Sequence, residues 1–232
     1  MSSYGSPVWH HQRATPTGCC FRGCPVTALP HIVWDMGGVM YRYFTELTLD
    51  VGADLGWPVH RIPLGPTGAL PDPDYERLLV GEINELGYVP IIIARLAALG
   101  IEFDPPRDLQ WHTQERPLTW ETIGRIHRAG HRQAVLTNDA SLWLGTGWRD
   151  TWEHAGWFDV LIDVATLDHR KPHPQPYLAA AETLEVPTKD CLFVDDLPVN
   201  CKGAEATGMQ SHLFSISDPE GSMIRLQERL GL

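Results

Sequence analysis

The chain has 232 residues, of which 43% are hydrophobic, and its 18 Lys and Arg against 29 Asp and Glu give a formal net charge of -11. This length suffices for one α/β core with a small inserted subdomain, and it argues against a tandem of two full domains. The acidic balance argues against nucleic-acid binding, so an anionic substrate needs a local positive site. No apolar run approaches the roughly 20 residues that cross a bilayer, and no secretory signal is evident. We therefore expect a cytoplasmic protein with no membrane partner.

Residues 1–29 are polar and rich in Pro, Gly and Ser, which favours a disordered N-terminal extension. Three of the five cysteines lie here, close to two adjacent histidines; the group is His10, His11, Cys19, Cys20 and Cys24. Its spacing matches no standard pair of CxxC zinc knuckles, and an odd cysteine count does not suggest a disulfide framework. A zinc site in this segment remains the less favoured alternative.

The first apolar run, residues 32–34, ends at Asp35 and a pair of glycines, a pattern that predicts a buried strand followed by a tight turn. The next part of the chain, residues 45–116, contains helical patterns over 47–55, 75–86 and 89–99. About 70 residues without a strand signal are too long for an ordinary loop, so we interpret this interval as a helical insertion.

After the insertion, apolar runs recur and alternate with stretches of helical spacing. The predicted strands cover 133–136, 160–162, 191–194 and 212–214, and the predicted helices cover 120–129, 176–184, 199–207 and 220–230. Such alternation predicts an α/β core with a parallel sheet covered by helices on both faces. We place this core in residues 30–44 and 117–232.

Ligands of open parallel sheets bind at the carboxyl ends of the strands, so the residues that close each apolar run are candidates for a site. These residues are Asp35, Thr137 and the pair Asp195 and Asp196. Lys171, which stands in a segment with two prolines, adds a cation. A carboxylate nucleophile, a hydroxyl donor, a cation and metal-seeking carboxylates together suit phosphoryl transfer, which depends on positioning and charge neutralisation.

Four segments resemble, in order and spacing, the four motifs of the haloacid dehalogenase-like superfamily. They are residues 33–39, residues 135–138, Lys171-Pro172 with Pro176-Tyr177, and residues 193–196 with Asn200 and Gly203-Ala204. The match spans about residues 31–215. It implies a Rossmann-like core with a helical cap inserted after the first motif, which closes over the active site and selects substrates. Residues 81–83 also resemble a recurring cap segment of such enzymes.

The resemblance assigns a role to each matching residue. Asp35 is implied to be the nucleophile that forms an aspartyl-phosphate intermediate, and Lys171 to hold the phosphoryl group and the nucleophile together. Thr137 is implied to donate its hydroxyl to a phosphoryl oxygen, with Asn138 and Gly38 binding the substrate. The implied cofactor is Mg²⁺, with Asp35, Asp195, Asp196 and the backbone carbonyl of Gly37 as its ligands. A small phosphorylated metabolite is the expected partner, bound by a monomer or homodimer.

The sequence departs from the family pattern at Gly37, where phosphatases of the family usually carry an aspartate that protonates the leaving group. Loss of a general acid and base typically costs about 10² to 10⁴ in rate. Either the substrate has a good leaving group, such as an anomeric sugar phosphate or an acyl phosphate, or another residue supplies the proton. The candidates for that residue are His60, His112, Tyr41 and Tyr43.

Two other functions stay open. Haloacid dehalogenases also lack this aspartate, because halide leaves unprotonated, but they need no metal and do not keep the pair Asp195 and Asp196. A catalytically weak protein that binds phosphorylated ligands or a protein partner is suggested by Gly37 and opposed by the retention of Asp35, Lys171 and Asp195. We expect a Mg²⁺-dependent phosphohydrolase, with sugar phosphates ahead of other substrates only by the leaving-group argument.

Overall fold

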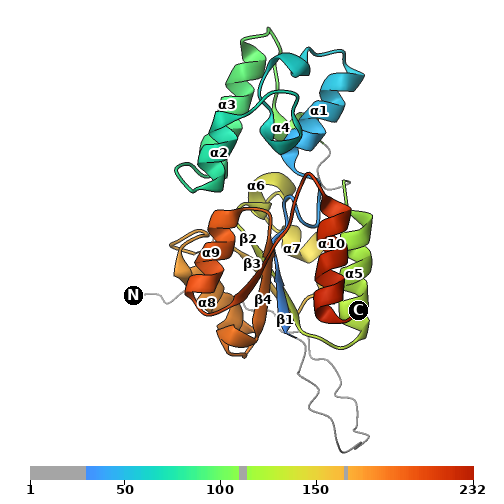
Figure 1. The fold of residues 1–232 in the computed structure, drawn as a ribbon, viewed down its shortest axis with the longest axis vertical. Coiled ribbons are helices and arrows are strands. Elements are labelled where there is room, and N and C mark those ends of the chain that lie inside the picture. The colour runs from blue at the N-terminus through green and yellow to red at the C-terminus, as the bar shows by residue number, and fades with distance from the viewer. Residues whose placement is uncertain (1–29, 110–113, 165–166) are drawn as a thin grey trace, which may run out of the picture.

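A computed structural model describes residues 30–109, 114–164 and 167–232. A five-stranded sheet lies between two layers of helices, and a lobe made of helices stands above one end of the strands (Figure 1). The expectation for residues 1–29, the alternative zinc site within them and the candidate His112 lie outside the described residues. None of the described helices is long and apolar enough to cross a membrane.

The sheet is entirely parallel and has the strand order β3-β2-β1-β4-β5. Its strands are β1 (His31–Trp34), β2 (Gln133–Thr137), β3 (Val160–Asp163), β4 (Cys191–Asp195) and β5 (Gln210–Leu213). Every residue of β2 and β4 is buried, as expected for central strands that are covered on both faces. The predicted α/β class with a parallel sheet is confirmed.

Neighbouring residues of β1, β2 and β4 alternate between two hydrophobic clusters, one on each face of the sheet. Trp34, Val135 and Val194 belong to the larger cluster, whereas Val33 and Phe193 belong to the smaller one. Helices α5 (Pro117–Arg128) and α10 (Pro219–Leu230) cover one face, and α8 (Pro174–Thr183) and α9 (Pro198–Ala206) cover the other (Figure 1). These four helices begin up to three residues before the predicted starts because each has proline in its first turn, where the missing N–H costs nothing.

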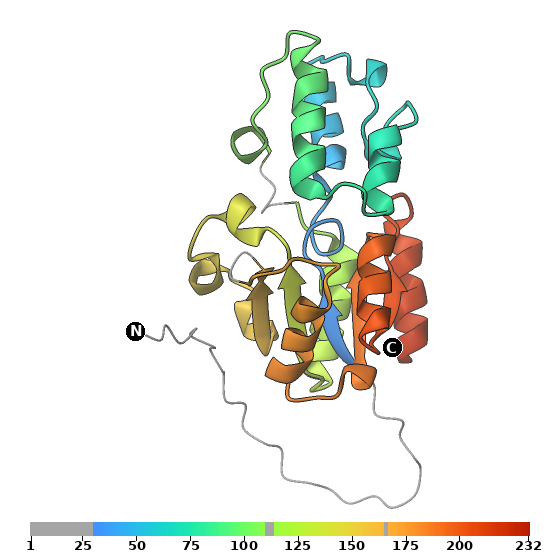
Figure 2. The ribbon, with the colours of Figure 1, turned by 90° about the vertical axis from the view of Figure 1, so that its left-hand side faces the viewer.

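The shorter elements of the core connect these layers. They are α6 (Ala140–Leu144), α7 (Trp148–Thr151), η4 (Ala155–Trp157) and η6 (Thr188–Asp190). Helix α6 follows β2 directly, so it begins at the end of the strands where Thr137 lies. Figure 2 shows α6 and α7 on the lobe-facing side of the sheet.

Residues 44–109, which we call the helical lobe, contain helices and no strand among their described residues. The elements are α1 (Phe44–Asp54), η1 (Val59–Arg61), η2 (Gly65–Thr67), α2 (Pro73–Leu79), α3 (Glu85–Ala97) and α4 (Pro105–Asp108). The predicted helix over 75–86 is too long, because Gly81 adopts a left-handed φ of 80° and Asn84 starts a new helix by capping it. The chain therefore turns between α2 and α3. The domain boundaries themselves stay a prediction.

A buried carboxylate holds the lobe together. Asp72 caps α2 and accepts hydrogen bonds from Tyr88 at 2.5 Å and from both terminal nitrogens of Arg95 at 2.9 and 3.0 Å. Burial by itself raises the pKa of this carboxyl, but the hydrogen bonds from Arg95 and Tyr88 outweigh it and lower the pKa to about 2. Asp72 is thus an ionised carboxylate that connects α2 to α3 through hydrogen bonds, and it is not a proton donor.

Two chain segments connect the lobe to the core and are bonded to each other. The N–H of Arg42 donates to the carbonyl of Gln114 at 2.8 Å, and the N–H of Arg116 donates to the carbonyl of Met40 at 2.9 Å. The buried side chain of Arg116 donates to the carbonyl of Gly38 at 2.7 Å and to Glu46 of α1 at 2.5 Å. The base of the lobe is therefore fixed to the loop that follows β1.

Candidate active site

Asp35 stands at the carboxyl end of the central strand β1. Its N–H donates to the carbonyl of Val194 at 2.8 Å, which continues the pairing of β1 with β4 and brings Asp35 beside Asp195. Asp35 is 8% exposed, and it lines a cavity together with residues of the lobe. A carboxyl group is thus presented at the sheet edge where parallel folds bind ligands.

Lys171 joins the ends of these two strands. Its Nζ lies 2.6 Å from Oδ1 of Asp35 and 2.9 Å from Oδ2 of Asp195, and its side chain is 1% exposed. Burial alone lowers the pKa of a lysine, but the two carboxylates outweigh it and raise the pKa of Lys171 well above its ordinary value. The ammonium is therefore charged, and it supplies the local positive site that an anionic substrate needs in this acidic chain.

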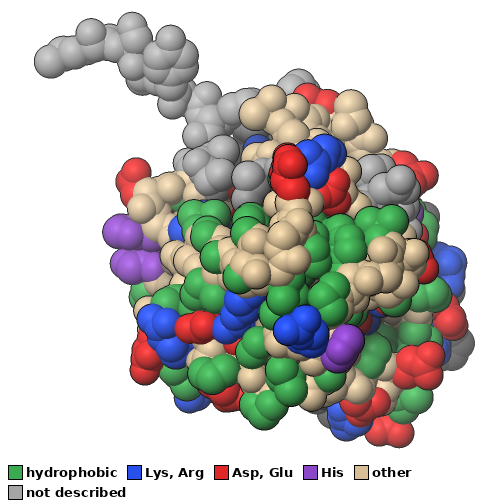
Figure 3. Space-filling view, turned by 90° about the horizontal axis from the view of Figure 1, so that it is seen from above, with side chains coloured by type: hydrophobic (Ala, Val, Ile, Leu, Met, Phe, Trp, Pro, Cys, Tyr) green, Lys and Arg blue, Asp and Glu red, His purple; other side chains and the backbone are tan. Residues whose placement is uncertain are grey.

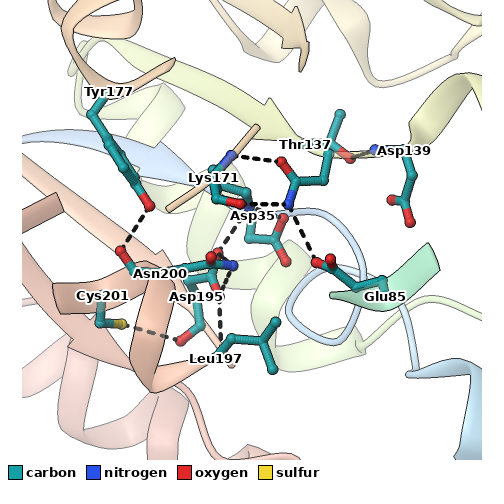
Figure 4. A network of polar contacts seen from close by, with 11 residues as sticks. Asp35, Glu85, Thr137, Asp139, Lys171, Tyr177, Asp195, Leu197, Asn200 and Cys201 are labelled. Atoms are coloured by element: carbon teal, nitrogen blue, oxygen red, sulfur yellow. Dashed lines mark hydrogen bonds and ion pairs between the residues drawn. The ribbon is translucent and has the colours of Figure 1, made fainter. Parts of the chain in front are cut away.

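Asp195 is held rigidly. Asn200 donates to both of its carboxylate oxygens at 3.1 Å, and the N–H of Leu197 donates to Oδ1 at 2.8 Å. The carbonyl of Asn200 in turn accepts a hydrogen bond from the hydroxyl of Tyr177 at 2.8 Å. Both oxygens of Asp195 thus have partners, and the carboxylate fixes Lys171 in place (Figure 4).

Asp196 differs from its neighbour because its Oδ2 is buried and has no hydrogen-bond partner. Carboxylate oxygens of Asp35, Asp195 and Asp196 lie within 4.8 Å of one another. Burial raises the pKa of Asp196 well above its ordinary value, and the charges of Asp195 and Asp35 raise it further. Burial also raises the pKa of Asp35, to about 8. Asp195 contributes to this rise, and Lys171 opposes it. Three converging carboxylates with one unpartnered oxygen fit a divalent cation, because such an ion takes oxygen ligands and offsets their repulsion.

Glycine is required beneath Asp196. Gly38 has a left-handed φ of 82°, and a Cβ built on it would lie 2.8 Å from Cγ of Asp196. Any other side chain would therefore displace this carboxylate. The carbonyl of Gly38 accepts a hydrogen bond from Arg116. The role of Gly38 in substrate binding stays a prediction.

Thr137 and Asn138 follow each other at the end of β2 but do different things. Thr137 is buried, and its hydroxyl oxygen accepts a weak hydrogen bond from the N–H of Asp139 at 3.4 Å, which leaves the hydroxyl proton available. The side chain of Asn138 accepts from the N–H of Lys171 at 3.0 Å and donates to its carbonyl at 3.4 Å. Asn138 therefore positions Lys171, a role that the sequence did not predict.

A cavity at the strand ends brings the predicted residues together with residues of the lobe. Its lining residues are Asp35, Gly37, Asn138, Asp139, Trp143, Asp196 and Leu197 from the core, Tyr43 from the segment that leads to the lobe, and Phe44, Glu85 and Val89 from α1 and α3 of the lobe. Seen from the lobe (Figure 3), Lys and Arg lie interspersed with Asp and Glu on the outer face. Lys171 does not line this cavity, but its Nζ lies 2.6 Å from Asp35, which does, so Lys171 can offer positive charge to an anion bound beside Asp35.

The candidates for the missing proton donor lie in different places. Tyr43 lines the cavity, whereas the hydroxyl of Tyr41 accepts a hydrogen bond from Trp152 at 2.8 Å and is not among the lining residues. His60 is exposed in η1 and does not line the cavity either. Glu85 and Asp139 were missed: Asp139 directly follows the predicted Thr137 and Asn138, but only packing shows that Glu85 approaches them.

The sequence is also similar to known proteins. The haloacid dehalogenase-like hydrolase family model matches residues 29–208. A putative pyrophosphatase PpaX of Caldanaerobacter subterraneus is 30% identical over 100 residues, which cover 43% of this chain and 45% of that protein. Phosphatase MT3486 of Mycobacterium tuberculosis is 27% identical over 194 residues, which cover 80% of this chain and 87% of that protein.

The fold is also similar to that of solved structures. A hydrolase from Streptococcus pneumoniae has a TM-score of 0.55 at 16% identity, and the comparison covers 88% of this chain and all of the other, 100%. This likeness concerns the fold alone. The family model, which covers most of the chain and all four motif segments, decides the family. The chain belongs to the haloacid dehalogenase-like hydrolase family.

Proposed function

We propose that the protein is a Mg²⁺-dependent phosphohydrolase that cleaves small phosphorylated metabolites through an aspartyl-phosphate intermediate on Asp35. The observation that carries the proposal is the placement of one buried ammonium, Lys171, between Asp35 and Asp195, with the unpartnered Oδ2 of Asp196 beside them. This combination binds a dianionic phosphoryl group and a cation at once. The names of the relatives, a phosphatase and a putative pyrophosphatase, support the same reaction class.

The residues at the site fit Mg²⁺, a hard cation that prefers oxygen ligands. Asp35, Asp196 and the carbonyl of Gly37 would hold it, with Asp195 nearby, since both oxygens of Asp195 already accept hydrogen bonds. When bound, the ion neutralises phosphoryl charge that the carboxylates would otherwise repel.

The chain's own residues account for the two chemical steps. Lys171 orients Asp35 and attracts the phosphate, Thr137 donates a hydrogen bond to a phosphoryl oxygen, and a carboxylate oxygen of Asp35 attacks phosphorus as the leaving oxygen departs. Water then attacks the same phosphorus and releases Asp35. Asn138 positions Lys171, and Asn200 positions Asp195, through hydrogen bonds.

The lobe limits the substrate to a small molecule. Phe44, Glu85 and Val89 of the lobe line the cavity together with Asp35, and the rings of Tyr43 and Trp143 line it as well. Aromatic rings beside a few polar groups suit a compact metabolite whose body packs against them. We place phosphorylated sugars first, because an anomeric phosphate has a good leaving group and Gly37 offers no side-chain acid.

A panel of small phosphorylated metabolites tests this function. We expect phosphate release in the presence of Mg²⁺ and its loss, restored by added Mg²⁺, when the ion is removed with EDTA. A parallel reaction with 2-chloropropionate measures chloride release. Chloride release without metal would instead indicate a dehalogenase. If neither phosphate nor chloride were released, the result would indicate a protein that only binds phosphorylated ligands or a partner.

A further inference from the structure

Two carboxyl groups in the cavity have no part in the steps described above. Asp139 follows β2, and Glu85 is the first residue of α3 in the lobe; both line the cavity that contains Asp35 and Asp196. Oε1 of Glu85 accepts a hydrogen bond from the side chain of Asn138 at 3.3 Å, which fixes its position at the base of the lobe. Figure 4 shows Glu85 entering from the lobe and Asp139 from the segment after β2, with Asp35 beside them.

The surroundings of Asp139 suit a group that gains and loses a proton. Burial raises its pKa, and the charge of Glu85 raises it further, whereas a hydrogen bond with Trp143 of α6 and the charges of Arg170 and Lys171 lower it; the resulting pKa is about 6. A proton donor or acceptor is most effective when its pKa lies near the working pH. Asp139 thus has the affinity for protons that this role requires.

A second feature of the cavity indicates that a polar ligand binds there. The hydroxyl of Tyr43 is buried, lines the same cavity and has no hydrogen-bond partner. Buried hydroxyls in native proteins nearly always have partners, so this one is expected to meet a polar atom of the substrate. Burial and the nearby Asp196 raise the pKa of Tyr43 well above its ordinary value, so it keeps its proton and can donate a hydrogen bond.

We propose that Asp139 is the general acid and base of the reaction, in place of the aspartate that is missing at position 37, and that Glu85 is its positioning residue. The inference rests on the proposed function and names the group that handles the proton. In an in-line attack by Asp35 the leaving oxygen departs on the far side of phosphorus, toward the lobe. Glu85 and Asp139 line the cavity in which that oxygen is released.

The proton balances over the two steps. In the first, the bond from Asp35 to phosphorus forms, the bond to the leaving oxygen breaks, and that oxygen takes the proton of Asp139 to become an alcohol. In the second, water attacks phosphorus, the bond to Asp35 breaks, and the Asp139 carboxylate takes the proton of that water. The chain returns to its starting state, with one water consumed for each ester cleaved.

Asp139→Asn separates this role from a structural one. For an alkyl phosphate, whose alkoxide must be protonated, we expect kcat/KM to fall by about 10² to 10⁴. For p-nitrophenyl phosphate, whose anion leaves without a proton, kcat/KM should change less than about tenfold. A rapid burst of nitrophenolate should then precede slow turnover, because the second step still needs the base. Equal losses for both substrates, or none for either, would overturn the inference.

Glu85→Gln provides a test that does not depend on the folding of the first variant. It keeps the oxygen that accepts from Asn138 but removes the charge that raises the pKa of Asp139. The acid form of Asp139 is lost as pH rises through its pKa, so activity toward the alkyl phosphate should decline at a lower pH in this variant than in the wild type. An unchanged pH profile would contradict the assignment.

Matched controls come from exposed residues of the same types. Asp150→Asn in α7 and Glu121→Gln in α5 each remove one negative charge at an exposed residue that does not line the cavity, and should leave the turnover of both substrates and the pH profile unchanged. A wild-type chain with no phosphatase activity would overturn the proposed function and this inference together. Wild-type activity that Asp139→Asn leaves intact would overturn the inference alone.

Discussion

Asp35→Asn is expected to lower phosphatase turnover by about 10⁴-fold or more while the fold remains intact. The amide has the shape of the carboxylate but cannot attack phosphorus, so no aspartyl phosphate forms. The fold should tolerate the change because Lys171 keeps its second partner, Asp195, at 2.9 Å. Phosphate release from the best substrate of the panel measures the loss, and thermal unfolding followed by circular dichroism measures the fold.

A matched control isolates the nucleophile from the general effect of removing a carboxylate. Asp150→Asn in α7 makes the same chemical change at an exposed residue that does not line the cavity and should retain full turnover. Unchanged turnover of Asp35→Asn would rule out covalent catalysis by this residue. If Asp35→Asn lost activity because it unfolded, a second experiment would replace it: acid quench of the wild-type chain during turnover, to trap the aspartyl phosphate. Absence of the trapped aspartyl phosphate would rule out covalent catalysis by Asp35.

Lys171→Met should abolish turnover and also destabilise the protein by about 3 to 5 kcal/mol. Methionine fills a similar volume without a charge, so Asp35 and Asp195 face each other in a buried site with no cation between them. Urea denaturation measures the free energy of unfolding. Added Mg²⁺ should recover part of that stability, because it binds the folded carboxylates, but it should not recover turnover.

Lys189→Met is the matched control for this prediction, because its side chain is 78% exposed and its ion pair with Asp190 is long, 3.9 Å. Exposed pairs contribute little, so this variant should keep its stability within about 0.5 kcal/mol and its activity. Equal stability of the two variants would contradict the placement of Lys171 as a buried counter-ion.

The fold could be predicted from the sequence because its central strands are continuous apolar runs. The edge strand is less regular: β5 begins at Gln210, two residues before the predicted start, because its half-exposed residues do not need to be apolar. The helix predicted over 75–86 is wrong in length because its apolar pattern continues through Gly81, where only backbone geometry reveals the turn.

Part of the site could be predicted because its residues lie at the ends of these apolar strands. Asp35, Thr137 and Asp195 end parallel strands, and the ends of parallel strands meet at one edge. Which side chains complete the cavity depends on how the lobe packs on the core, and sequence spacing does not carry that information. Glu85, 53 residues from its partner Asn138, is the clearest case.

The binding of Mn²⁺, a paramagnetic substitute for Mg²⁺ with the same preference for oxygen ligands, tests the central claim most directly. Titration followed by electron paramagnetic resonance should show about one ion bound per wild-type chain and an affinity at least about tenfold weaker in Asp196→Asn, which loses the unpartnered carboxylate oxygen. Equal affinity of the two proteins would contradict a cation held by Asp35 and Asp196 beside Lys171.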